Sequence, residues 1–205
     1  MLLRIAVAMS AVLLAACSRS GEPKKDEQPA AARPEAAQNV FNVRFDTSQG
    51  PFTIEVHRDW APLGAERFEA LVKDRFYNGA RFFRVVPNFV IQFGIPADPR
   101  MHKKWNKPIK DDDPVQTNRY KSVAFATSGP ESRTTQVFIN LRSNQTLDKQ
   151  GFVPFGIVTE GMEVVEKLYA GYGERPVQSK IERQGNTYLV ANFPKLDYIR
   201  TAQIR

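Results

Sequence analysis

The chain has 205 residues, of which 42% are hydrophobic and 25% charged, so it is long enough for one globular domain and an additional segment. Its formal net charge is +7, which falls to +6 (28 basic and 22 acidic residues) if Arg4 is removed with a leader. The basic residues form no continuous stripe, because those of residues 100–110 lie in a proline-rich stretch that also holds Asp111, Asp112 and Asp113. This distribution argues against binding of nucleic acid.

The first 16 residues have the composition of a secretory signal peptide. Arg4 precedes a run of apolar and small residues that reaches Cys17 and is interrupted only by Ser10. This run is shorter than the roughly 20 residues that a bilayer-spanning helix requires. We therefore expect residues 1–16 to direct export and not to remain as a membrane span.

The apolar run ends in Leu14-Ala15-Ala16-Cys17, which resembles the lipobox of bacterial lipoproteins. In these proteins the cysteine becomes the first mature residue and carries acyl chains that anchor it in the bilayer. The alternative is an ordinary signal peptide in which Cys17 is incidental. Ser18 favours the outer over the inner membrane in the sorting pattern of Gram-negative lipoproteins, so the expected location is the periplasmic side of that membrane.

Residues 17–39 contain no aromatic or large aliphatic side chain and are rich in proline, alanine and charged residues. Such a segment cannot bury enough apolar surface to fold, so we predict a disordered tether. Cys17 is the only cysteine, and its lipidation leaves no thiol for a disulfide, a thiolate metal site or a nucleophile. The folded domain is therefore assigned to residues 40–205.

The folded domain begins with a predicted hairpin and a helix. Residues 42–56 alternate apolar and polar side chains on both sides of a turn at residues 48–50, which is typical of a hairpin with one buried face. A helix is predicted over residues 62–73, with Asp59 capping its first turn. Its apolar face would comprise Leu63, Phe68, Leu71 and Val72.

Short strands dominate the rest of the domain. They are predicted at residues 80–86, 90–93, 123–126, 137–141, 155–158 and 198–204, with a second helix at residues 161–168. Many short strands with two helices are typical of a mainly β fold, a closed antiparallel barrel capped at its ends. Residues 95–121 and 170–194 show no regular pattern, and long loops of this kind commonly carry function or lie beside the site.

Polar side chains interrupt two of the apolar strand patterns. Arg84 and Gln92 do so within residues 82–94, and Gln136 directly precedes Val137 and Phe138. Apolar walls with a few polar groups set into them are typical of a groove for a small ligand or a peptide.

The residues favour chemistry that needs no nucleophile, metal or cofactor. His57 and His102 lack zinc-binding spacing, and the chain has no glycine-rich phosphate loop and no G-x-S-x-G elbow. A catalytic Ser/His/Asp triad remains an alternative, although no motif indicates one. One reaction that fits is rotation about an Xaa-Pro amide. Its barrier of about 18–20 kcal/mol arises from amide resonance. A fixed guanidinium would bind the twisted amide better than either planar isomer, because the prolyl nitrogen accepts a hydrogen bond only once resonance is broken.

At these residues the chain resembles the cyclophilin family of peptidyl-prolyl isomerases, and the resemblance extends over residues 40–205. The matching motifs are Arg84-x-x-Pro-x-Phe89-Val90-x-Gln92-x-Gly94, residues 126–130, residues 135–140, Leu147-Asp148 and Phe155-Gly156. Their order and spacing agree as well. The resemblance implies a closed eight-stranded antiparallel barrel capped by two helices, with a surface groove that holds proline.

The resemblance also implies the site residues. Arg84 would engage the prolyl nitrogen, Gln92 would orient Arg84 and contact the substrate carbonyl, and Phe89 would complete the catalytic set. Taken singly, each large apolar residue is more readily explained as core. The implied substrate-binding residues are Val90, Phe138 and Leu147 in the proline pocket, Ala126 and Thr127 on the backbone that pairs with substrate, Gln136 in the adjoining subsite, and Phe152.

Four positions depart from the family pattern. Phe83 stands where a histidine commonly precedes the arginine, and Val90 replaces a frequent methionine. Thr146 stands where many members have a tryptophan that binds cyclosporin, so we expect weak inhibition by that drug. Phe152 aligns with the pocket histidine after a one-residue length difference. The departures put substrate preference in question and leave the expected activity in place.

The sequence thus predicts a lipid-anchored, exported peptidyl-prolyl cis-trans isomerase. It would act as a monomer, without a cofactor, on proline-containing polypeptides of the cell envelope. One alternative is a proline-binding chaperone or adaptor lipoprotein that uses the same groove without turnover. Another is a purely structural envelope lipoprotein, in which Arg84 and Gln92 would have no effect on any phenotype.

Overall fold

The computed structural model describes residues 39–205. The predicted signal peptide, the lipidation site at Cys17 and nearly all of the predicted tether lie outside these residues. No helix within residues 39–205 is long and apolar enough to cross a bilayer.

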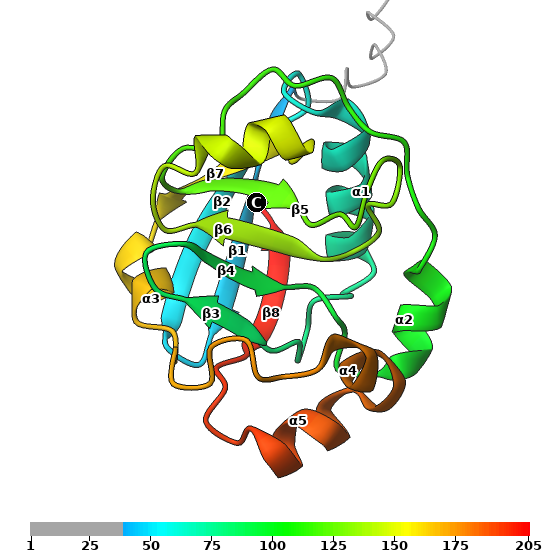
Figure 1. Ribbon diagram of the computed structural model, residues 1–205, viewed down its shortest axis with the longest axis vertical. Coiled ribbons are helices and arrows are strands. Elements are labelled where there is room, and N and C mark those ends of the chain that lie inside the picture. The colour runs from blue at the N-terminus through cyan, green and yellow to red at the C-terminus, as the bar shows by residue number, and fades with distance from the viewer. Residues whose placement is uncertain (1–38) are drawn as a thin grey trace, which may run out of the picture. The chain divides into compact units, whose positions relative to one another are not determined.

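The domain is built on one eight-stranded antiparallel sheet in the order β3-β4-β6-β5-β7-β2-β1-β8, which curls into a half-barrel (Figure 1). The strands are β1 Val40–Thr47, β2 Gly50–His57, β3 Arg84–Val86, β4 Val90–Phe93, β5 Ser122–Phe125, β6 Val137–Asn140, β7 Pro154–Glu160 and β8 Ile199–Ile204. An isolated antiparallel bridge between Arg81 and Tyr198 joins the segments that flank the edge strands β3 and β8. The predicted mainly β, eight-stranded fold is confirmed.

The hydrophobic core fills the inside of the curled sheet. Side chains of β1 alternate between buried and partly exposed along the whole strand, as the sequence pattern predicts. Phe45 of β1 stacks on Phe52 of β2 with ring centroids 4.9 Å apart, and it meets Phe93 of β4 edge-on at 5.7 Å. These aromatic pairs join strands from both halves of the sheet, and α1 packs against the same sheet through β2, β7 and β8.

The helices are more numerous than the sequence predicts. They are α1 Pro62–Lys73, α2 Pro99–Trp105, the 3₁₀-helix η1 Gln145–Gln150, α3 Met162–Glu166, α4 Gln178–Gln184 and α5 Asn186–Asn192. Helix α1 has the predicted bounds, whereas α3 is shorter than expected. The expectation that residues 95–121 and 170–194 are irregular throughout was wrong, because they contain α2, α4 and α5.

The cap of α1 comes from a distant segment and not from Asp59. The N-cap residue Ala61 makes no capping hydrogen bond through its side chain. Instead, the carboxylate of Asp112 accepts hydrogen bonds from the backbone N–H groups of Leu63 and Gly64, both at 2.9 Å. Leu63 is 39% exposed and does not belong to the buried face, which is a second correction to the predicted helix.

A second apolar cluster holds α4 and α5 against the sheet. Phe83, the residue at the expected histidine position, is 1% exposed and packs with Ile181 of α4 and Leu189 of α5. The two helices lie together below β3 and β8 in Figure 1, where they are drawn in orange. The departure at residue 83 therefore has a packing reason, because a phenylalanine there provides an apolar base for residues 170–194.

Candidate active site

A groove of about 720 Å³ opens beside β3, β4 and β6. All ten side chains that the sequence predicts for the site line it, namely Arg84, Phe89, Val90, Gln92, Ala126, Thr127, Gln136, Phe138, Leu147 and Phe152. Arg84 and Phe138 thus share one cleft, although the chain separates them by more than fifty residues. The fold thus brings all the predicted site residues together in one groove.

The apolar part of the groove is a small cluster separate from the main core. Its buried members are Val90, Ala124, Phe138 and Leu147, with Phe89, Ala126 and Phe152 packed against them. The rings of Phe138 and Phe152 meet edge-on, with centroids 5.5 Å apart. Because the four buried members come from β4, β5, β6 and η1, the sheet and η1 together fix the shape of the pocket.

A polar row crosses the sheet beside this pocket. Arg84 on β3 lies opposite Gln92 on β4, which lies opposite Phe138 on β6. Nη1 of Arg84 donates to Oε1 of Gln92 at 3.3 Å, and Nε2 of Gln92 donates to Oε1 of Gln136 at 2.8 Å. The guanidinium carbon also lies 5.5 Å from the centre of the Phe89 ring, within the range of a cation–π contact.

Arg84 has an acidic partner that no sequence motif indicated. Oε1 of Glu174 accepts a hydrogen bond from Nε at 2.6 Å and lies 2.6 Å from Nη2. Gln178 and Glu182 also line the groove, as does Asn106 of the other long segment. The only signal for these residues was the unusual length of the two segments, which did predict a position beside the site.

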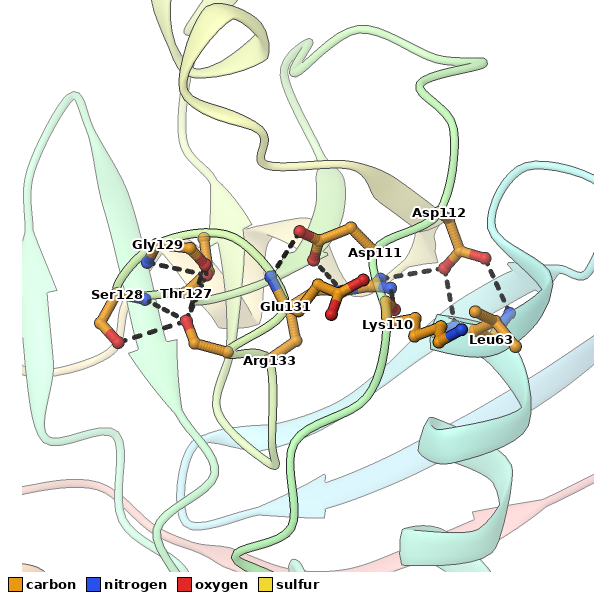
Figure 2. A network of polar contacts seen from close by, with 11 residues as sticks. Leu63, Lys110, Asp111, Asp112, Thr127, Ser128, Gly129, Glu131 and Arg133 are labelled. Atoms are coloured by element: carbon orange, nitrogen blue, oxygen red, sulfur yellow. Dashed lines mark hydrogen bonds and ion pairs between the residues drawn. The ribbon is translucent and has the colours of Figure 1, made fainter.

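The loop between β5 and β6, which carries Thr127, is held by a buried ionic network (Figure 2). Arg133 is 1% exposed, and its Nε and Nη1 donate to Asp111 at 3.0 Å and to Asp112 at 2.9 Å. Its Nη2 donates to the carbonyl oxygen of Lys110. Since Asp112 also caps α1, the network fastens the loop to the helix.

Hydrogen bonds within the same loop fix the residues next to the groove. The hydroxyl groups of Thr127 and Ser132 lie 2.7 Å apart, and the backbone N–H of Ser128 donates to Oγ of Ser132 at 2.9 Å. At the base of the loop, the N–H of Ala126 donates to the carbonyl of Gln136 at 2.9 Å. The backbone of residues 126–128 is thereby held in place along one wall.

Another part of the groove wall depends on Asp148 in η1. Its Oδ1 accepts from the backbone N–H of Asn118 at 2.8 Å and from Nδ2 of the same residue at 2.7 Å, and its Oδ2 accepts from the Thr117 hydroxyl. Burial alone would raise the pKa of Asp148, but these hydrogen bonds outweigh it and the pKa is lowered. The carboxylate therefore anchors the turn that places Leu147 at the pocket.

The groove holds no arrangement typical of a metal site. Among residues 39–205, no group of three or more His, Cys, Asp or Glu side chains is placed to hold a metal ion. His57 lies away from the groove, where its ring stacks on Trp60 with centroids 3.8 Å apart.

Comparison with known proteins gives a family match over most of the described residues. The model of the cyclophilin type peptidyl-prolyl cis-trans isomerase family matches residues 42–186. The chain is 38% identical over 132 residues to a peptidyl-prolyl cis-trans isomerase of Acinetobacter baylyi, covering 62% of this chain and 70% of that protein. It is 34% identical over 139 residues to peptidyl-prolyl cis-trans isomerase A of Dickeya dadantii, covering 65% and 73%.

Solved structures show the same fold. A crystal structure of a cyclophilin type isomerase from Cryptosporidium parvum matches with a TM-score of 0.61 and 21% identity, covering 81% of this chain and 98% of that one. A second structure of that protein, obtained in the presence of the dipeptide Ala-Pro, matches with a TM-score of 0.60 and 21% identity, covering 80% and 98%. The chain belongs to the cyclophilin family of peptidyl-prolyl cis-trans isomerases.

Proposed function

We propose that this enzyme accelerates Xaa-Pro isomerisation in polypeptides that fold in the bacterial cell envelope, and that Arg84 is the group that lowers the barrier. The single observation that supports the mechanism most is that Arg84 and the apolar pocket of Phe138 line the same groove. The use of Ala-Pro with a related cyclophilin supports a proline-containing peptide as the ligand.

In this mechanism the pocket holds the prolyl ring while the chain on the other side of the amide turns. Twisting removes the resonance of the amide, and the prolyl nitrogen then becomes able to accept a hydrogen bond from Arg84. An interaction that exists only in the twisted state lowers the barrier without stabilising either planar isomer. Gln92 would contact the substrate carbonyl, and the backbone of Ala126 and Thr127 would pair with the extended peptide.

The test is a protease-coupled assay with a short Xaa-Pro peptide and purified residues 40–205. We expect Arg84→Ala to lower kcat/KM at least tenfold, or about 1.4 kcal/mol of transition-state binding. Arg84→Lys should restore little of this, because an ammonium does not reproduce the planar donor. Arg142→Ala, an exposed arginine outside the groove, is the matched control.

Two results would contradict the proposal. Unchanged activity of a folded Arg84→Ala variant would remove the arginine from the mechanism. Binding of a proline peptide by the wild-type protein without any rate enhancement would replace turnover with the function of a proline-binding chaperone or adaptor.

We also propose that Cys17 is acylated and holds the enzyme on the periplasmic side of the outer membrane. The support is the lipobox at residues 14–17, the position of the single cysteine within it, and Ser18 after it. Several acyl chains give stable anchoring, whereas one chain gives only marginal binding.

Fractionation of cells that produce the wild-type protein and Cys17→Ser tests this anchoring. We expect the wild-type protein in the outer-membrane fraction and the variant in the soluble periplasmic fraction at full length, because the variant cannot receive lipid. Membrane retention of Cys17→Ser would disprove lipid anchoring, and cytoplasmic wild-type protein would disprove export.

A further inference from the structure

The polar contacts of Arg84 are unequal in length. The hydrogen bond to Gln92 inside the groove is 3.3 Å long, whereas the contacts of Nε and Nη2 with Glu174 are both 2.6 Å. Arg84 begins β3, a three-residue strand at the edge of the sheet, and its side chain is 26% exposed. A long side chain at such an edge needs more than one partner to keep a single direction.

Glu174 is itself held by the backbone next to it. The carbonyl of Gly173 accepts from the N–H of Val85, the residue after Arg84, at 3.3 Å. On the other side, Nη2 and Nε of Arg175 donate to the carbonyls of Gly171 at 2.7 Å and Tyr172 at 3.2 Å. The segment that carries Glu174 is therefore tied to β3 and also closed on itself.

The aromatic ring of Tyr172 adds an apolar anchor. It meets the rings of Tyr169 and Phe193 edge-on, with centroids 5.0 Å and 5.1 Å away. It also packs against the cluster that contains Phe83 and Ile181. Glu174 thus sits on a segment with contacts to β3, to α4 and to residues just after α5.

Oε1 of Glu174 contacts both Nε and Nη2 and so occupies the Nε edge of the Arg84 guanidinium. Together with Gln92, three of the five N–H groups of Arg84 then have partners in the described part of the chain. The remaining N–H groups lie on Nη1 and Nη2, at the end of the side chain that lines the groove. Glu174 is 62% exposed, so screening by water makes the pair weak as a source of stability.

We propose that Glu174 is a positioning residue, which holds the Nε edge of Arg84 so that the outer N–H groups of the guanidinium face the prolyl amide. The inference rests on the proposed role of Arg84. It deepens that role by assigning the orientation of the guanidinium to a segment outside the sheet. A carboxamide at residue 174 would keep an acceptor in the same place, whereas a methyl group would not.

The test compares Glu174→Ala, Glu174→Gln and the exposed control Glu163→Ala in the full-length chain. We expect Glu174→Ala to lower kcat/KM about fivefold through kcat, with KM nearly unchanged, because a misdirected donor weakens only the twisted state. Glu174→Gln should keep at least about half of the activity. All variants should keep the unfolding midpoint of the wild-type protein.

Two outcomes of this assay would overturn the proposal. Equal or higher activity of Glu174→Ala would mean that Glu174 competes with substrate for Arg84 and does not position it. An equal loss in Glu174→Gln and Glu174→Ala would mean that the charge matters and that the hydrogen bond does not.

A second measurement keeps this inference separate from the proposed function. In ¹⁵N NMR spectra, the Nε–H of Arg84 should give a protected signal in the wild-type protein and in Glu174→Gln, and should exchange with solvent in Glu174→Ala. An unchanged Arg84 signal in Glu174→Ala would overturn the positioning role even in an active enzyme. If no form of the protein has isomerase activity, the proposed function fails while the NMR experiment still decides whether Glu174 orders Arg84.

Discussion

Gln92 uses both ends of its side-chain amide and so links Arg84 to Gln136. Its oxygen accepts from Arg84 at 3.3 Å, and its nitrogen donates to Gln136 at 2.8 Å. The residue is only 6% exposed, so the loss of either partner would leave a polar group with little access to water. Gln92 therefore has a fixed amide orientation, with its oxygen toward the arginine.

We predict that Gln92→Ala lowers kcat/KM about fivefold, because Arg84 loses its hydrogen-bond partner inside the groove. In an Arg84→Ala background the same change should lower kcat/KM by clearly less than in the wild-type protein, since the part of its effect that acts through Arg84 is already lost. The four proteins of this double-mutant cycle are compared in the peptide assay, with Gln203→Ala on β8 as the control. Additive losses would show that Gln92 acts on substrate independently of Arg84.

At the scale of single residues, the main groove residues could be predicted from the sequence, but the residues that hold them in place could not. Nine of the ten predicted residues fall in short motifs with definite order and spacing, Phe152 aligns only after a one-residue length difference, and all ten line one cleft. Glu174 has no such motif, and its contact with Arg84 spans 90 positions of the chain. The capping role of Asp112 was missed for the same reason. Rules for helix capping consider only residues next to the helix in the sequence, and the candidate there is Asp59.

The 3₁₀-helix η1 forms one wall of the groove and depends on charged and amide side chains. Asp148 accepts hydrogen bonds from Asn118, and Nδ2 of Asn144 donates to the carbonyl of Phe89 at 3.0 Å. These contacts connect η1 to the segment before β5 and to the turn before β4. The position of Leu147 at the pocket is therefore sensitive to the charge of Asp148.

This charge predicts a pH dependence of stability. Because the pKa of Asp148 is lowered in the folded state, its carboxylate stabilises the fold above about pH 4 and loses this effect as the pH falls through the folded pKa. We expect Asp148→Asn to unfold at lower urea concentration than the wild-type protein at pH 7. The difference should shrink at pH 3.

Urea titrations at several pH values measure this difference, with the exposed Asp113→Asn as the control. A difference between wild type and Asp148→Asn that stays constant from pH 7 to pH 3 would contradict the assignment to the carboxylate charge.

At the scale of elements, the strands and helix α1 could be predicted from the sequence pattern, whereas the short helices α2, α4 and α5 could not. The alternation in residues 42–56 and the periodicity of residues 62–73 predicted β1, β2 and α1 correctly. Helix α4 has seven residues and buries only Ile181, so it offers too few apolar positions to show a period. The start of helix α2 does have a sequence signal in Asp98 and Pro99, since Asp98 caps the helix by accepting a hydrogen bond from the N–H of Arg100.

For the molecule as a whole, the buried Arg133 connects parts that are far apart in sequence. It joins residues 110–112 to the loop between β5 and β6, and through Asp112 it reaches the start of α1. Gly64 leaves room for this contact, because a Cβ at that position would lie 3.2 Å from Nη1 of Arg133. The network thus supports one groove wall and a main helix together.

We predict that Arg133→Met lowers the free energy of unfolding by about 3–5 kcal/mol, because it leaves the buried carboxylate of Asp112 without its cation. Urea denaturation measures the loss, and Arg142→Ala should match the wild-type protein. A change below about 1 kcal/mol for Arg133→Met would mean that water replaces the guanidinium.

Strands β1 and β8 are neighbours in the sheet although they are the first and last strands of the described chain. Many native contacts therefore have high contact order, which slows folding relative to helical proteins of similar size. During synthesis from the N-terminus, the hydrogen-bonding edge of β1 stays open to pairing with other chains until residues 199–204 emerge. The pairing of the first strand with the last therefore makes the interval before β8 is complete the one in which this fold is most prone to aggregate.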